Sequence, residues 1–196
     1  PQYRFDKASV IVSFGADFLG TWIAPVQFTQ QYTAARRGIK GMSRHIQYET
    51  NLSLTGSNAD VRIPIAPSQE GVYLLNLYNK IAASAGAPTL SAPAIEAPVN
   101  MIDNTAKELL ANKGKSLVVS GSNDIDVQLL VNAINSLLGN IGTTIDMVNY
   151  SKQKLGNDAE MEAFVKDMND GKIGAVIFYN SNPAYNYYSP EAIKSG

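Results

Sequence analysis

Three runs of strand-forming residues in this chain each lead into a short loop of small and polar residues. The runs are Val10–Ser13, Leu117–Ser120 and Val176–Tyr179, and each loop begins at the next residue. A strand that is covered on both faces is apolar along its whole length. Ligands of open parallel sheets bind beyond the carboxyl ends of the strands. The sequence therefore predicts buried parallel strands that end at a ligand-binding edge.

Helical patterns separate the predicted strands. We expect strands at 8–14, 44–48, 61–65, 116–120, 145–148 and 175–179, and helices that begin at Pro25, after Ser68, near Asp103, at Ile125 and at Asp158. The first helix is expected to turn Val26, Tyr32 and Ala35, or their near neighbours, inward. Strands that alternate with helices of this length favour parallel sheets with right-handed crossovers. The fold class predicted is therefore α/β, in two halves.

A Pro/Ala-rich passage separates the two halves. Residues 84–100 contain three prolines, which a regular helix does not tolerate, so we expect an extended connector. The predicted organisation is a first α/β unit at 1–83, the connector at 84–100 and a second α/β unit at 101–196. Pro190 looks like the first turn of a helix that is cut short. We therefore expect a piece of a longer protein, with its second unit truncated at the C-terminus.

Composition excludes several chemistries. The chain has no cysteine and one histidine, which rules out disulfides, thiolate ligands and iron–sulfur ligation and disfavours a Ser-His-Asp triad or a histidine-rich zinc site. We predict no metal site and no catalytic residue, and a structural role for His45. A pI near 5.8 argues against nucleic-acid binding. No run approaches the roughly 18 apolar residues that span a bilayer, so no direct membrane insertion is expected.

The loops themselves leave two interpretations open. None has the G-x-G-x-x-G or G-x-x-x-x-G-K-[ST] spacing, so conventional NAD and ATP sites are disfavoured. Gly15, Gly121 and Asn182 either serve tight turns alone or belong to one shared crevice. The four tyrosines between 179 and 188 favour a protein interface over a small-molecule site.

Four segments carry a resemblance to a known family. Residues 10–17, 58–70, 132–142 and 171–183 resemble, in this order, the second and third domains of molybdopterin oxidoreductases. Residues 42–60 are more narrowly similar to the molybdopterin-oxidoreductase-like iron–sulfur subunit of alternative complex III, a quinol:cytochrome c oxidoreductase. The resemblance implies two Rossmann-like units with mainly parallel sheets.

The resemblance also implies a cofactor-binding edge. In the wider family, loops at the positions of residues 15–17, 67–70, 121–123 and 180–183 hold the two guanine dinucleotide arms of the pterin cofactor. The family's Gly-x-Asn-Pro is Gly15-Ala16-Asp17-Phe18 here, and its Pro-Gly-Thr-Asp is Pro67-Ser68-Gln69-Glu70. These bulkier residues narrow the approach to the backbone. The implied positions, vestigial or still dinucleotide-binding, are Gly15, Ala16, Asp17, Glu70, Gly121, Asn123, Asn180, Asn182 and Pro183.

Two functions follow as expectations. In the first, the segment is a cofactor-free structural scaffold in a membrane-associated electron-transport complex of a respiratory chain, and its partners are the other subunits. In the second, it is the dinucleotide-cradling part of an active bis-molybdopterin guanine dinucleotide oxidoreductase. Iron–sulfur clusters would lie elsewhere in the parent protein. A generic nucleotide-binding module is a third, more distant expectation. The resemblance also implies an exported parent on the periplasmic side of the membrane.

Overall fold

The computed structural model describes residues 1–38, 41–95, 99–151 and 156–196. The chain divides into two compact units, Pro1–Tyr150 and Ser151–Gly196.

The larger unit is built around a four-stranded parallel sheet with the strand order β4-β3-β2-β5. Val12 in the central strand lies opposite Ile46 on one side and Val118 on the other. A separate two-stranded antiparallel ribbon joins β1 to β6. The elements of this unit are β1 (Gln2–Tyr3), η1 (Phe5–Lys7), β2 (Val10–Phe14), α1 (Pro25–Ala35), β3 (Arg44–Glu49), α2 (Leu54–Ser57), β4 (Val61–Pro64), η2 (Pro67–Gln69), α3 (Glu70–Ala85), α4 (Val99–Ala111), β5 (Ser116–Ser120), α5 (Ile125–Leu137) and β6 (Ile145–Asp146).

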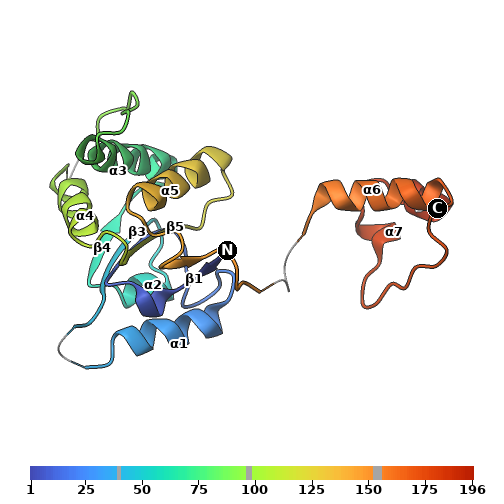
Figure 1. The fold of residues 1–196 in the computed structure, drawn as a ribbon, viewed down its shortest axis with the longest axis horizontal. Coiled ribbons are helices and arrows are strands. Elements are labelled where there is room, and N and C mark those ends of the chain that lie inside the picture. The colour runs from blue at the N-terminus through green and yellow to red at the C-terminus, as the bar shows by residue number, and fades with distance from the viewer. Residues whose placement is uncertain (39–40, 96–98, 152–155) are drawn as a thin grey trace. The chain divides into compact units, whose positions relative to one another are not determined.

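Helices cover both faces of the sheet. Figure 1 shows α3, α4 and α5 on one side of the strands and α1 on the other. Because side chains alternate along a strand, Val12 and Phe14 pack with α3, α4 and α5, whereas Ile11 packs with α1 and η1. Every residue of β2 and β5 is buried. This arrangement confirms the predicted α/β class with a parallel sheet and is compatible with a Rossmann-like fold.

The second sheet-containing unit is not confirmed. β5 follows the Pro/Ala-rich passage, yet it pairs with β2, so residues on both sides of that passage share one sheet. The expected strand at 175–179 is wrong, since these residues form no strand. The expected strand at 145–148 is the short β6, which pairs antiparallel with β1. An apolar run becomes a strand only where another strand offers hydrogen bonds to its backbone, and sequence pattern alone does not show that neighbour.

The passage after α3 lies along that helix as an ordered arm, which comprises residues 86–95. Asn79 donates to the Leu90 carbonyl and accepts from the Leu90 amide, both at 2.8 Å. Asn76 donates to the Pro93 carbonyl at 3.0 Å, and the Tyr78 hydroxyl donates to the Pro88 carbonyl at 3.0 Å. These bonds fix the extended backbone that the prolines favour. Residues 96–98 of the predicted connector lie outside the described residues.

The inward face of α1 is partly different from the expected one. Phe28 and Tyr32 are buried, as expected for Tyr32, whereas Val26 is 86% exposed. Residues four positions apart share a helix face. Val26, two positions before Phe28, points roughly 200° away from it. Val26 itself is therefore not on the inward face, and its near neighbour Phe28 is buried in its place.

Polar side chains occupy the outer edge of β5. Asn135 accepts from the Val118 amide at 3.1 Å and donates to the Val118 carbonyl at 2.7 Å. Thr144 donates to the Ser116 carbonyl at 2.6 Å, and Gln128 donates to the Ser120 carbonyl at 3.2 Å. An open strand edge is a template for pairing with another chain. Side chains of α5 and of the segment before β6 thus close this edge of the sheet.

The smaller unit contains α6 (Asp158–Asn169), α7 (Pro183–Asn186) and α8 (Pro190–Ser195). Asn169 joins α6 to α8, because it donates to the Ala192 carbonyl at 2.8 Å and accepts from the Ser195 hydroxyl at 2.7 Å. In the segment that connects α6 to α7, the side chains of Ile177 and Tyr179 are 92% and 90% exposed. Across the described part of the chain, no helix combines the length and the apolar character needed to cross a membrane.

Candidate functional site

The candidate site lies where the carboxyl ends of β2 and β5 meet. From β2 the chain continues to β3 and β4 on one side, and β5 lies on the other side, so this is the point at which strand order reverses. Ligands of open α/β sheets bind in the crevice at such a point. The structure therefore brings two of the three predicted loops together, those at Gly15 and Gly121. The third belongs to the smaller unit.

The two loops pack directly against each other. The Gly121 amide donates to the Phe14 carbonyl at 2.9 Å, and the Gly15 amide donates to the Tyr48 carbonyl at 2.8 Å. Gly15 has φ +62°, a conformation that favours glycine. A Cβ atom on Gly121 would lie 2.6 Å from the Gly15 carbonyl oxygen. Position 121 therefore requires glycine, because the backbone of Gly15 approaches it too closely for a side chain.

The carboxylate of Glu70 occupies this crevice. The Ser120 hydroxyl donates to Glu70 Oε1 at 2.6 Å, and Glu70 Oε2 would lie 3.6 Å from a Cβ atom placed on Gly15. Burial raises the pKa of Glu70, and the hydrogen bond from Ser120 opposes that rise. Among the described residues, no lysine or arginine forms an ion pair with Glu70. The site therefore has a partly buried acid where a phosphate would need a positive environment.

Asp17 ties the loop after β2 to the start of α2. Its Oδ1 atom accepts from the Thr55 amide at 3.1 Å and from the Thr55 hydroxyl at 2.8 Å. Gly20 lets the chain curl around this carboxylate, since a Cβ there would lie 2.2 Å from Asp17 Oδ2. The neighbouring Ala16 is buried, and its carbonyl accepts from the Ser13 hydroxyl at 3.1 Å. Both predicted residues thus make internal contacts of the loop.

The start of α5 is also occupied by a carboxylate. Asp124 accepts from the Asp126 and Val127 amides at 2.9 and 3.1 Å. Amides at the start of a helix are the groups that commonly bind phosphates. Asn123 is exposed beside them. Two of the amides that a phosphate would use here are therefore already bonded to an acidic side chain.

The third predicted loop lines a cavity within the smaller unit. Asn182 and Pro183 border a volume of about 400 Å³ together with Phe164 of α6 and Tyr187. Asn180 has φ +50°, in the left-handed region that asparagine tolerates better than most residues. No strand precedes this loop, so the predicted strand-end geometry is absent in this part of the described chain.

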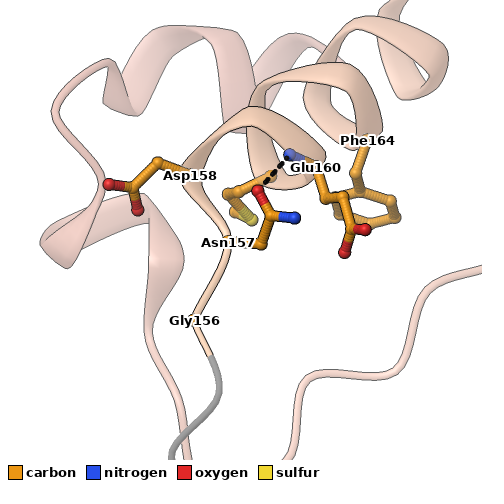
Figure 2. A pocket seen from close by; sticks show the side chains of 6 residues that line it. Gly156, Asn157, Asp158, Glu160 and Phe164 are labelled. Atoms are coloured by element: carbon orange, nitrogen blue, oxygen red, sulfur yellow. Dashed lines mark hydrogen bonds between the residues drawn. The ribbon is translucent and has the colours of Figure 1, made fainter. Parts of the chain in front are cut away.

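A second cavity, of about 600 Å³, opens at the start of α6 (Figure 2). Met161 and Phe164 line this cavity as well as the neighbouring one. Asn157 caps the helix by accepting from the Glu160 amide at 3.2 Å, the dashed bond in Figure 2. Asp158 and Glu160 contribute two acidic side chains to the lining of this cavity. The lining suits an apolar group better than an anion.

Known protein families offer no match to this chain, and no curated protein is significantly similar to it in sequence. The resemblance to molybdopterin oxidoreductases therefore stays a prediction.

Replacing Gly121 by alanine tests the loop packing. We expect a loss of about 1–3 kcal/mol in the free energy of unfolding, the usual cost of overpacking, because the new methyl group would meet backbone atoms of Gly15 and not a movable side chain. Urea denaturation measures the change. The control is Gly71→Ala in α3, where the nearest atom to the new Cβ is 3.8 Å away. A Gly121→Ala variant as stable as the control would contradict the packing described.

Proposed function

We propose that this chain is a cofactor-free framework segment of a molybdopterin-oxidoreductase-like subunit in a membrane-associated respiratory complex of the quinol:cytochrome c oxidoreductase type. The observation that carries the cofactor-free assignment is the Glu70 carboxylate, held by Ser120 in the crevice between β2 and β5. Two like charges about 4 Å apart repel by roughly 4 kcal/mol at an effective dielectric constant near 20. A dinucleotide phosphate placed that close to an ionised Glu70 would meet this repulsion.

Two further observations support the same conclusion. Asp17 satisfies the start of α2, and Asp124 satisfies the start of α5, so two clusters of donors near the edge are bonded internally. In this proposal the α/β body organises neighbouring subunits of an electron-transport complex, and electrons pass through iron–sulfur clusters elsewhere in the parent. The parent is exported and lies on the periplasmic side of the membrane. Nucleic acid is not among its partners.

The test is the metal and pterin content of the full-length protein, purified from its native membrane. We expect a preparation that contains iron but no stoichiometric molybdenum or tungsten, and no pterin fluorescence after oxidative release. Iron serves as the internal control, because its presence shows that the clusters survived purification. Stoichiometric molybdenum with pterin would overturn the proposal.

A second candidate is the dinucleotide-cradling part of an active molybdenum enzyme. The close approach of the Gly15 and Gly121 loops favours it, because glycine-rich strand ends are common at phosphate sites. Calorimetric titration of this chain with guanosine diphosphate separates the two candidates. The scaffold assignment predicts no saturable binding to the wild-type chain, whereas saturable binding that weakens in Gly121→Ala supports the cradle.

A further inference from the structure

One face of β3 is polar although it is buried. His45, Gln47 and Glu49 alternate with Ile46 and Tyr48, so the three polar side chains point to the same side of the sheet. Their exposed fractions are 0%, 0% and 4%. Buried polar groups are normally hydrogen-bonded, because an unpaired one costs about 1–3 kcal/mol. We call these three residues the polar row.

The Glu49 end of the polar row has a fixed charge. Arg62 Nε lies 2.6 Å from Glu49 Oε1, and the Ser53 hydroxyl donates to Glu49 Oε2 at 2.6 Å. Burial alone would raise the pKa of Glu49, but the hydrogen bonds from Ser53 and Arg62 outweigh it and hold the pKa below its usual value. Glu49 is therefore an acceptor only.

This acceptor orients the amide of Gln47. Gln47 Nε2 donates to Glu49 Oε2 at 3.3 Å, which turns Gln47 Oε1 toward His45 Nε2 at 3.2 Å. A carbonyl oxygen cannot donate, so the proton of this second bond belongs to His45 Nε2. A flipped amide would place two oxygens of Gln47 and Glu49 against each other.

The other ring nitrogen, Nδ1, then faces the Tyr32 hydroxyl as a hydrogen-bond acceptor. Tyr32 Oη lies 3.1 Å from His45 Nδ1 and 2.9 Å from the Asn58 carbonyl oxygen. With the proton of neutral His45 on Nε2, Nδ1 carries no hydrogen. The single hydroxyl hydrogen of Tyr32 is therefore divided between the Asn58 carbonyl oxygen and Nδ1. The bonds from Glu49 through Gln47 to His45 are thus directed from the Glu49 end, whereas the Tyr32 hydroxyl also donates to the Asn58 carbonyl.

We propose that Glu49 sets the tautomer of His45 through Gln47, and that the polar row thereby couples the carboxyl end of β3 to helix α1. The coupling runs from Arg62 on β4 and Ser53 before α2, through three side chains of β3, to the hydroxyl of Tyr32. It needs no bound cofactor and is independent of the proposed function.

His45 is neutral at pH 7 in this environment. Burial lowers its pKa to about 4, although the Gln47 hydrogen bond acts in the other direction. The charged and titratable groups around the ring are Tyr32 of α1, Arg36 directly after α1, Asp60 before β4 and Glu49. Asp60 accepts from the His45 amide at 2.7 Å and pairs with Arg36 at 2.8 Å. The Phe18 ring, 5.3 Å from the imidazole, adds no charge.

The row also reaches the candidate site. Glu49 accepts from the Ser53 amide at 3.3 Å, and Asp17 accepts from the Thr55 amide two residues later. The two carboxylates hold the same short segment at the start of α2. A displacement of the loop after β2 would therefore reach Glu49 through this segment, and would reach His45 through Gln47.

The experiment uses the fact that His45 is the only histidine of the chain. A long-range ¹H–¹⁵N correlation spectrum of the imidazole therefore reports this residue without assignment. At pH 7 we expect the Nε2–H tautomer in the wild-type chain and in Tyr32→Phe, because the proton is directed from the Gln47 side. In Glu49→Gln we expect the Nδ1–H tautomer to become populated, since glutamine at this position can donate as well as accept.

The matched control is Glu108→Gln, which removes a carboxylate of α4 that pairs with Arg44 at 3.5 Å. It should leave the imidazole spectrum unchanged. If Glu49→Gln does not fold, Gln47→Leu removes the orienting carbonyl and should give the same tautomer change. A wild-type Nδ1–H tautomer overturns the proposal, and so does a folded Glu49→Gln or Gln47→Leu variant with an unchanged ¹⁵N spectrum.

Discussion

Replacing Asn135 by leucine should lower the free energy of unfolding of the larger unit by about 4 kcal/mol. The amide and carbonyl of Val118 both bond to the Asn135 carboxamide, and Asn140 donates to it at 2.9 Å. Leucine has a similar volume but offers no polar atom. The two backbone groups of Val118 would stay buried without partners, at about 1–3 kcal/mol each.

Chemical denaturation of the folded chain measures this loss. The matched control is Asn132→Leu, on the exposed side of the same helix, where the change should stay within about 0.5 kcal/mol. A loss of less than 1 kcal/mol for Asn135→Leu would mean that water or a shifted side chain replaces the carboxamide at the edge of β5.

Acidification should destabilise the fold through His45. Its pKa is about 4 in the folded chain and has the ordinary value of 6.5 when unfolded. Between pH 6.5 and 4 the unfolded chain binds a proton that the folded chain does not, so stability falls as pH falls through this window. At 1.36 kcal/mol per pKa unit, the full loss is about 3 kcal/mol.

The measurement is the free energy of unfolding at a series of pH values for the wild type and for His45→Gln. Carboxylates titrate in both proteins, so the difference between the two curves isolates the histidine. This difference should change by about 3 kcal/mol between pH 7 and pH 4. Parallel curves would show that His45 titrates normally in the folded chain. A direct NMR titration of the single histidine gives its folded pKa independently.

The sequence predicted most elements of the larger unit because each has a strong local signal. Strand 116–120 contains the apolar run 117–119, and α5 begins at the expected Ile125. The predictions failed where the structure of a segment depends on residues that are distant in sequence. Residues 175–179 have the same apolar pattern as β5, but no strand pairs with them in the described structure. Proline content at 84–100 marked a boundary, whereas the bonds from α3 that hold residues 88–93 have no local signal.

Part of the candidate site was also predictable. The positions of Gly15 and Gly121 follow from their places after apolar runs, and the structure brings them into contact. The sequence did not predict the hydrogen-bond partners of the two carboxylates. Glu70 bonds to Ser120, and Asp17 bonds to Thr55, across long stretches of sequence. The buried polar face of β3 was missed for a related reason, since polar residues in a strand usually indicate exposure.

The Pro/Ala-rich arm has a mechanical consequence. Its carbonyls at Pro88, Leu90 and Pro93 are tied to three side chains of α3, and proline restricts the backbone between them. Lys80 of α3 also pairs with Asp103 of α4 at 2.9 Å. The segment whose composition most resembles a flexible hinge is therefore held rigidly against α3. If α3 tilts, the arm should move with it as part of one rigid body.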